Sequence, residues 1–265
     1  NNVIYIVSAT EFYFMNIVPQ SAANPLFAGT AQSQTGPFST SSMSGNSVFY
    51  RIGLCRGCGT SSTVAPDLSL GVINVPAAGS FTLTADQNQG GTLTPQSFSG
   101  TYTVDSSGRV VLQAGALGAY ILYLQTSNRG YLLSTGSDVG EGSIDGQSAG
   151  PFTTASLNGA FFLGTTDQTE QNVSDNSGVA SFDGLGAVFG TTDSVSLGSP
   201  PSSNTFSQSY SVTNGTGTPG RGTVTASGVT NSIFYIISAS KIVMMDVTNN
   251  SGMPNPNPAI TSSRK

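Results

Sequence analysis

One apolar segment occurs three times in this sequence, and that repetition restricts what the chain can fold into. Residues 3–9 are a near copy of residues 233–239, and the match continues without a gap from residues 10–16 into residues 240–246. Residues 121–133 carry a third, more divergent copy. Two apolar runs separated by a short polar turn predict a β-hairpin. We therefore expect three copies of one hairpin along the chain.

Other segments recur at nearly the same spacing. Residues 36–45 match residues 150–159, and residues 98–104 match residues 206–212. Such regular self-similarity is typical of tandem copies of one structural unit, here about 115 residues long. The spacings differ slightly, which indicates loop insertions between homologous units.

The landmarks divide the chain into three parts. Residues 31–146 and 147–265 each run from a Gly-Pro-Phe entry segment to a hairpin and form one complete unit apiece. Residues 1–30 carry the hairpin of a preceding unit and a linker. We expect either that the natural polypeptide extends upstream or that this hairpin completes a neighbouring molecule.

The local patterns predict an all-β fold. The apolar runs are short, rich in β-branched and aromatic residues, and bounded by Gly, Asn, Asp or Pro. Helix is expected only as short turns near residues 38–43 and 152–157. About eight strands per unit must hide their edges, and closure into an up-and-down barrel does this most completely. Antiparallel β-barrels in tandem are the first prediction, and two-sheet β-sandwiches are the alternative.

Aromatic residues recur at equivalent positions of the units and are expected to pack in the cores, because aromatics at strand spacing are far more often core than ligand site. This predicted repeat core consists of Tyr5, Tyr123, Tyr235, Phe38, Phe152, Phe98, Phe206, Tyr102 and Tyr210.

The charge balance argues against nucleic-acid binding. The chain has 8 basic and 13 acidic residues, a net charge of −5, and charged residues make up only 8% of it. Phosphate neutralisation requires clustered Lys and Arg, which are missing. A neutral surface rich in Gly, Ser and Thr favours a secreted or cell-surface location. No apolar stretch approaches the roughly 20 residues that span a bilayer.

The motifs resemble those of a known group of repeats. Residues 156–162, residues 182–186, and residues 98–104 followed by Gly108-Arg109 fit a Ser/Thr/Gly-rich tandem repeat found in long secreted or surface proteins of environmental bacteria. The resemblance covers nearly the whole chain. It implies a lipocalin-like barrel and an exterior location, and no catalytic residue follows from it. The first unit departs from the pattern at residues 81–86, where an Asp-Gly turn is expected.

A pair of cysteines, Cys55 and Cys58, occurs in the first unit alone. A structural zinc site needs about four ligands, and the chain has no histidine. Haem attachment needs a histidine where Gly59 stands, and a thioredoxin-like role expects a following helix. A local disulfide in an oxidising compartment is the favoured interpretation.

The sequence contains few of the residue combinations that catalysis requires. Without histidine, no Ser-His-Asp or Cys-His arrangement can form, and the scattered acids are typical of turn formers. We therefore predict a non-enzymatic protein with no catalytic residue, no metal site and no cofactor.

The predicted function is structural. Tandem barrels suggest a component of an extracellular fibre, sheath or adhesin, self-associating with copies of itself or with upstream repeats, and linked by exchanged hairpins. The Pro-rich residues 253–258 are expected to form an extended connector after the last barrel, or a strand that reaches a neighbouring molecule. The alternative is a secreted module that binds a glycan or lipid in the barrel interior.

Overall fold

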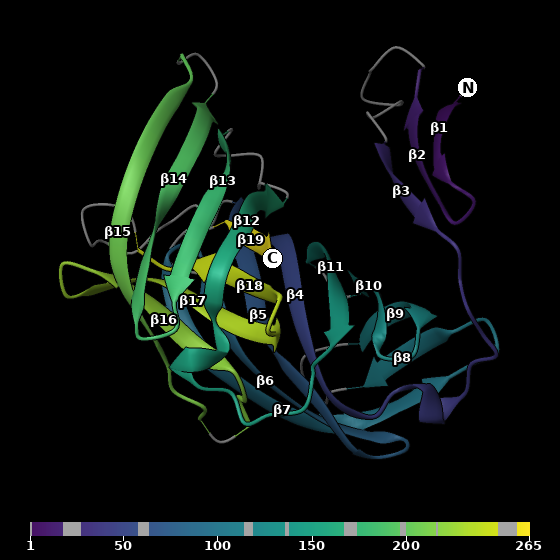
Figure 1. Cartoon of the computed structure of the whole chain (residues 1–265). Coiled ribbons are helices and arrows are strands. Elements are labelled where there is room, and N and C mark those ends of the chain that lie inside the picture. The colour runs from purple at the N-terminus through teal and green to yellow at the C-terminus, as the bar shows by residue number, and fades with distance from the viewer. Residues whose placement is uncertain are drawn as a thin grey trace.

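The computed structural model describes residues 2–17, 28–57, 64–113, 119–135, 138–166, 174–196, 200–215, 217–248 and 259–265. These residues form two closed antiparallel barrels of eight strands and a separate three-stranded sheet (Figure 1). The predicted tandem barrels are therefore confirmed, and the sandwich alternative is wrong. No helix in the described part of the chain is long and apolar enough to cross a membrane.

The first barrel runs from residue 45 to residue 146. Its strands follow one another around the barrel, and β11 closes it by pairing with both β10 and β4. The strands are β4 (Gly45–Arg56), β5 (Val64–Ala77), β6 (Ser80–Gln89), β7 (Thr92–Val104), β8 (Arg109–Gln113), β9 (Ala119–Thr126), β10 (Arg129–Ser134) and β11 (Val139–Gly146).

The second barrel repeats this plan between residues 158 and 264. It is closed by β19, which pairs with β18 and β12. The strands are β12 (Asn158–Thr166), β13 (Ser174–Asp183), β14 (Ala187–Ser196), β15 (Ser202–Val212), β16 (Arg221–Ala226), β17 (Val229–Ser238), β18 (Lys241–Asp246) and β19 (Ile260–Arg264).

The N-terminal sheet consists of β1 (Asn2–Ser8), β2 (Glu11–Asn16) and β3 (Ala28–Gln32). Its order matches β9-β10-β11 and β17-β18-β19, so it corresponds to the last three strands of a barrel. Each repeated hairpin is therefore followed by one further strand. This corrects the expectation for the Pro-rich segment: residues 253–258 lie outside the described residues, but the chain after them returns as β19 and closes the second barrel.

The two predicted helical turns exist as single 3-10 turns, η1 (Thr40–Ser42) and η3 (Thr154–Ser156), beside one end of each barrel. The Tyr102 hydroxyl donates to the carbonyl oxygens of Thr40 and Met43, at 2.9 and 3.2 Å. Tyr210 does the same in the second barrel, reaching Thr154 and Leu157 at 3.0 and 2.9 Å. A buried phenol bonded to two carbonyls fixes the turn to the barrel.

The repeated Gly-Arg pair requires glycine at its first position for a steric reason. Gly108 and Gly220 have φ values of +78° and +74°, in the left-handed region. A Cβ atom on Gly108 would lie 2.9 Å from the ring of Phe38, and one on Gly220 would lie 3.1 Å from the ring of Phe152. Only glycine combines this backbone conformation with such a close approach.

Six of the predicted core aromatics pack in the barrel interiors. Phe38, Phe152, Tyr102 and Tyr210 are buried, and Phe98 and Phe206 pack against the two cores while staying partly exposed.

The prediction is wrong for two of the three hairpin tyrosines. Tyr5 and Tyr123 are 64% and 46% exposed, whereas Tyr235 is completely buried. All three occupy the same hairpin position and face outward from their barrels or sheet. Tyr235 is buried because another barrel covers it.

Candidate functional site

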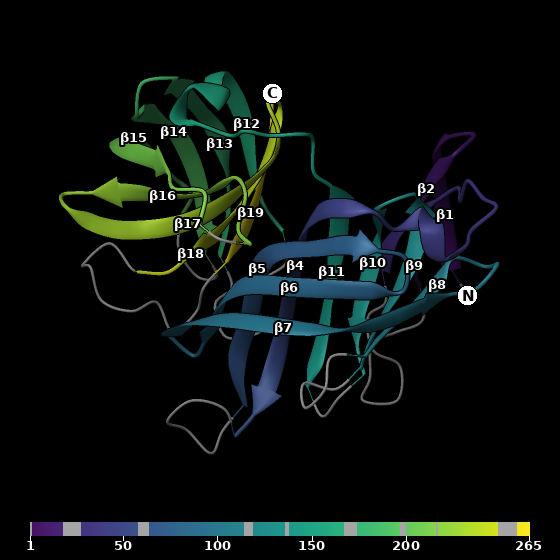
Figure 2. The same ribbon diagram turned by 90° about the horizontal axis from the view of Figure 1, so that it is seen from below.

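The first barrel lies between the second barrel and the N-terminal sheet (Figures 1 and 2). We call the outward side of a barrel's first three strands its opening face, formed by β4–β6 in the first barrel and β12–β14 in the second. We call the outward side of the strands that carry the repeated Gly-Arg pair and the repeated hairpin its closing face. This face is formed by β8–β10 in the first barrel and by β16–β18 in the second. The closing face of the second barrel packs on the opening face of the first.

The contact between these two faces is a hydrophobic core of its own. Its buried members from both barrels are at most 6% exposed, as in a domain interior. The first barrel contributes Val48, Ile52, Leu68, Leu70 and Val72, with Tyr50 at the edge, and the second contributes Ile233, Tyr235, Ile237, Val243, Met245, Val247 and Ile260. Burial of this many large apolar side chains stabilises the contact strongly.

A polar cluster lies at the border of this core. Asp86 on the opening face accepts hydrogen bonds from Arg221 Nε at 2.8 Å and Nη2 at 2.9 Å. The Tyr235 hydroxyl donates to the same carboxylate at 2.9 Å. The bond to Asp86 raises the pKa of Arg221, and burial, together with the negative charge of Asp86, raises the pKa of Tyr235. A bidentate Arg–carboxylate pair with a third donor fixes both position and orientation.

The end of β11 and the segment that follows it add further contacts. Lys241 Nζ lies 2.6 Å from an Asp145 carboxylate oxygen, and the backbone N–H of Ser148 donates to the carbonyl of Ile237 at 2.8 Å. The same bond recurs one unit earlier, where the N–H of Thr35 donates to the carbonyl of Gln125 at 2.8 Å. The N-terminal sheet is thus joined to the first barrel as the first barrel is joined to the second.

The corresponding face of the second barrel is exposed in the described part of the chain and is only partly apolar, with Ser177 and Asp175 at the positions of Leu70 and Leu68. Strand register identifies the equivalent positions: Val48 pairs with Val72 in the first barrel, and Phe162 pairs with Val179 in the second. Phe162 and Val179 are 62% and 47% exposed.

Register also places Asp193 at the position of Asp86. Leu70 pairs with Asp86 across β5 and β6, and Ser177 pairs with Asp193 across β13 and β14. Asp193 is exposed and accepts a hydrogen bond from Ser203 at 2.5 Å. Among the described ion pairs, none includes Asp193. The outward carboxylate has therefore been kept where its arginine partner is missing.

The first barrel has the complementary surface. Arg109 pairs with Tyr123 across β8 and β9, as Arg221 pairs with Tyr235 across β16 and β17. Tyr131 and Leu133 on β10 continue this closing face and are 47% and 48% exposed. Arg109 and Tyr123 of the first barrel thus correspond to the arginine and tyrosine that bind Asp86. Tyr123 is 46% exposed, and Arg109 is partly buried.

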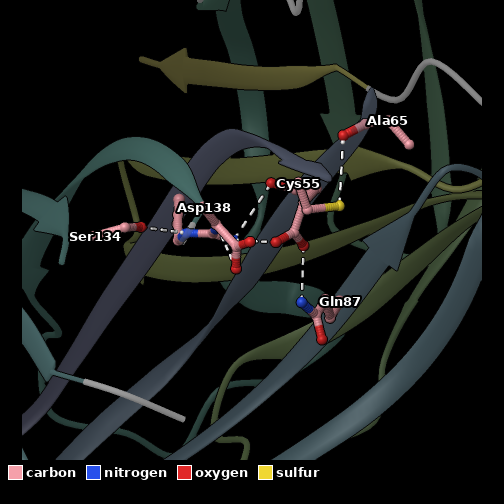
Figure 3. Close-up of polar contacts among 7 residues, drawn as sticks. Cys55, Ala65, Gln87, Ser134 and Asp138 are labelled. Carbon is pink, nitrogen blue, oxygen red and sulfur yellow. Dashed lines mark hydrogen bonds and ion pairs between the residues drawn. The ribbon is translucent and has the colours of Figure 1, made fainter. Parts of the chain in front are cut away.

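The interior of the first barrel is closed at one end by a buried ion pair. Arg51 Nη1 lies 2.7 Å from Asp67 Oδ2, and both side chains are at most 4% exposed. Arg51 Nε donates to the Ser134 hydroxyl, and Gln87 donates to the other Asp67 oxygen, each at 2.7 Å (Figure 3). Asp138 lies 3.9 Å from the guanidinium. This network places both charges of an ion pair in the interior of the first barrel.

Cys55 is buried beside this network, with its Sγ atom 3.5 Å from the carbonyl oxygen of Ala65 (Figure 3). Its predicted partner, Cys58, lies outside the described residues, so the disulfide stays a prediction.

The interior of the second barrel contains a cavity of about 520 Å³, which is within the size range of small-molecule sites. Its apolar wall includes Leu163, Phe182, Val188, Phe206, Val224 and Met244, and its polar lining includes Thr165, Asn176, Ser194, Asn204, Asn231, Ser232 and Asp246. Asp246 is the only charged group among the described residues that line it.

Of the acids predicted to form turns, Asp105 and Asp183 do so, whereas Asp175 and Asp193 lie within strands β13 and β14. The Asp183 carboxylate accepts from the backbone N–H groups of Leu185, Gly186 and Ala187, and Asp105 accepts from Ser107 and Arg109. Within the described ranges, no three His, Cys, Asp or Glu residues converge as metal ligands.

Comparison with known proteins gives little further information. No family model matches the sequence, and no curated protein matches it. One solved structure with a related outline is a DUF3598-family protein of unknown function from Nostoc punctiforme, at 10% identity and a TM-score of 0.26, covering 83% of this chain and 94% of that one. A likeness at that TM-score carries no argument about function.

Proposed function

We propose that the protein is a structural component of an extracellular assembly, in which barrels stack by placing a closing face on an opening face. The observation that carries the proposal is the difference in burial among the three hairpin tyrosines. Tyr235 is buried against a neighbouring barrel, while Tyr123 and Tyr5 are exposed. An exposed apolar patch rimmed by polar groups is typical of an interaction site. The low charge content and abundant Ser and Thr support the extracellular location.

Between copies, the opening face of one second barrel would receive the closing face of another copy's first barrel. Asp193 would then meet Arg109 and Tyr123, and the Phe162–Val179 pair would cover Tyr131 and its neighbours. Asp193, Arg109 and Tyr123 would take the positions of Asp86, Arg221 and Tyr235 in the contact within one chain. The apolar part of that contact would be reproduced only in part, because Ser177 stands at the position of Leu70.

The N-terminal sheet influences this association. It corresponds to the last strands of a barrel. The hydroxyl oxygen of Thr30 on β3 lies 3.4 Å from the hydroxyl oxygen of Tyr131 on the closing face of the first barrel. An incoming second barrel would bring its own β17–β19 to the same place. The sheet therefore has to swing aside or exchange with these strands, and the free energy of that rearrangement weakens association. Such an exchange is the molecular form of the predicted hairpin swap.

Sedimentation velocity over a range of protein concentrations tests the stacking. The unchanged protein is expected to form larger species as concentration rises to about 100 µM, a range that detects weak interfaces. Val179→Arg places a charge at the centre of the uncovered opening face and should keep the protein monomeric. Leu185→Arg is the matched control, because Leu185 is 89% exposed in the turn between β13 and β14 and outside this face.

Association that is the same in the Val179→Arg protein would disprove stacking through this face, and so would a monomer at every concentration of the unchanged protein. Circular dichroism of each variant checks that the barrels remain folded.

A second function, binding of a small molecule inside the second barrel, is favoured by its cavity of about 520 Å³. The combination of an apolar wall with hydroxyl, amide and carboxyl groups suits an amphiphilic ligand. Saturable uptake of one aromatic probe molecule per chain is the expected result, and no saturation up to about 1 mM would contradict this function.

A further inference from the structure

The interiors of the two barrels differ in their charged groups, and this difference indicates what the second barrel binds. The strand pairs Leu132–Leu122 and Met244–Phe234 are equivalent, which places Ser134 of the first barrel at the position of Asp246 in the second. Likewise, Phe49 and Leu163 hold equivalent positions, so that Arg51 corresponds to Thr165 two residues further along the strand. At this depth the first barrel has the Arg51–Asp67 ion pair, whereas the second has the carboxylate of Asp246 without a cation among the described lining residues.

The arginine of the first barrel fills its interior. Its guanidinium binds Asp67 on β5 and Ser134 on β10, and Asp138, just before β11, lies 3.9 Å from it. In the second barrel, the shorter Thr165 side chain instead donates to the carbonyl of Asn176, at 3.2 Å. Part of the volume of the cavity is therefore space that the arginine occupies in the other barrel.

Asp246 is poorly satisfied in its cavity. Its side chain is half-buried and accepts one described hydrogen bond, from the Ser232 hydroxyl at 2.9 Å. No Lys or Arg is among the described residues that line the cavity. Burial raises the pKa of the Asp246 carboxyl. A buried carboxylate without a cation is costly, and a cationic partner that enters the cavity removes much of that cost.

The remaining walls describe the rest of the ligand. Phe182, Phe206 and Met244 line the cavity on its apolar side, where an aromatic or aliphatic body can pack. Ser232 and Asp246 lie directly opposite each other on β17 and β18. A molecule with an apolar body and one protonated amine can place its body on the apolar wall and its ammonium group against these two side chains.

We propose that the cavity of the second barrel binds a small amphiphilic amine. The ammonium group of this ligand lies beside Asp246 and supplies the positive charge that the Arg51 guanidinium supplies in the first barrel. The inference rests on the proposed binding function of the cavity and adds the chemical class of the ligand. It is independent of the stacking between barrels.

Tryptamine and tryptophol are suitable probes, because they share an indole body and differ in an ammonium against a hydroxyl group. The protein contains no tryptophan, so the indole fluorescence reports the probe alone. We expect tryptamine to bind at least about tenfold more tightly than tryptophol at neutral pH, since hydrogen bonds to charged groups are the stronger ones. Isothermal titration of the full chain provides the stoichiometry, expected to be one.

The variant Asp246→Asn keeps the size of the side chain and a partner for Ser232 but removes the charge. It should abolish the preference for tryptamine and leave tryptophol binding within about twofold, because the apolar contacts persist. Asp193→Asn removes an acid that is exposed on the outside of the same barrel and does not line the cavity, and it should retain the preference.

The pH dependence has a definite sign. The raised pKa of Asp246 means that its carboxyl holds a proton at pH values where an ordinary aspartate has lost it. Tryptamine selects the ionised form, so its affinity should rise with pH through this range with release of a proton, and the rise should disappear in Asp246→Asn. No other titratable group is among the described lining residues.

The outcomes separate the two levels of the proposal. Absence of saturable binding by either probe would contradict the binding function itself. Equal affinity for the two probes, or a preference that survives in Asp246→Asn, would leave a binding cavity but disprove the amine as its ligand class.

Discussion

The variant Arg51→Met is expected to lower the free energy of unfolding by about 3–5 kcal/mol, the range found when one partner of a buried ion pair is removed. The loss arises because Asp67, 1% exposed, would keep a charge inside the barrel with Gln87 as a neutral partner. Urea denaturation followed by circular dichroism measures it. Arg56→Met is the matched control, since Arg56 is exposed at the end of the same strand and should change stability by at most about 0.5 kcal/mol.

A second substitution identifies the cause. In the double variant Arg51→Met with Asp67→Leu both charges are gone, and most of the lost stability should return. If the double variant is as unstable as the single one, then packing of the arginine stem rather than the uncompensated carboxylate accounts for the effect.

The variant Asp86→Ala is expected to loosen the two barrels from each other. It leaves Arg221 and the Tyr235 hydroxyl without their shared partner at a largely buried interface, and truncating one member of such a hydrogen-bonded charge cluster costs about 2–5 kcal/mol. Differential scanning calorimetry should show a single transition in the unchanged protein separating into two in the variant. A single transition at an unchanged temperature in Asp86→Ala would contradict the assigned role.

The repeat supplies the matched control. Asp193→Ala removes the equivalent carboxylate from the second barrel, where no barrel covers it, and should leave unfolding of the dilute protein unchanged. A second readout is the ultraviolet titration of tyrosine. Asp86 helps to raise the pKa of Tyr235, so this phenol should ionise at lower pH in Asp86→Ala than in the unchanged protein.

The repeat in the sequence predicted the barrels, because the unpaired edge strands of a sheet are protected when the sheet closes, and each unit contains enough strands to close. It did not predict the strands after the hairpins. β11 (Val139–Gly146) is rich in glycine, and β19 (Ile260–Arg264) is short and polar, so neither has the apolar pattern of a strand. Both are held by pairing on two sides, which depends on the closed barrel rather than on local preference.

The direction of the hairpin tyrosine could not be read from the sequence. Both faces of these strands are apolar: Phe234 and Ile236 face the interior, and Tyr235 and Ile237 face the other barrel. Alternation identifies the inner face only when the outer one is polar. An outer apolar face that recurs in every unit was itself the signal for contact between barrels.

The sequence alone predicts the charged residues of the candidate sites only in part. Asp86 and Asp193, or Ser134 and Asp246, become equivalent once strand register is known, and sequence spacing alone does not provide that register because the loops differ in length. The cavity of the second barrel also depends on the absence of an arginine at Thr165, a difference that has meaning only inside a barrel.

Charge exchange across the proposed contact tests stacking most directly. In the variant Asp193→Arg the opening face would meet Arg109 of another copy with like charge, and in Arg109→Asp the closing face would meet Asp193 with like charge. Each variant alone should therefore sediment as a monomer, whereas an equimolar mixture restores opposite charges at both contacts and should form larger species. A mixture that sediments as its separate components do would contradict stacking of these barrels through these faces.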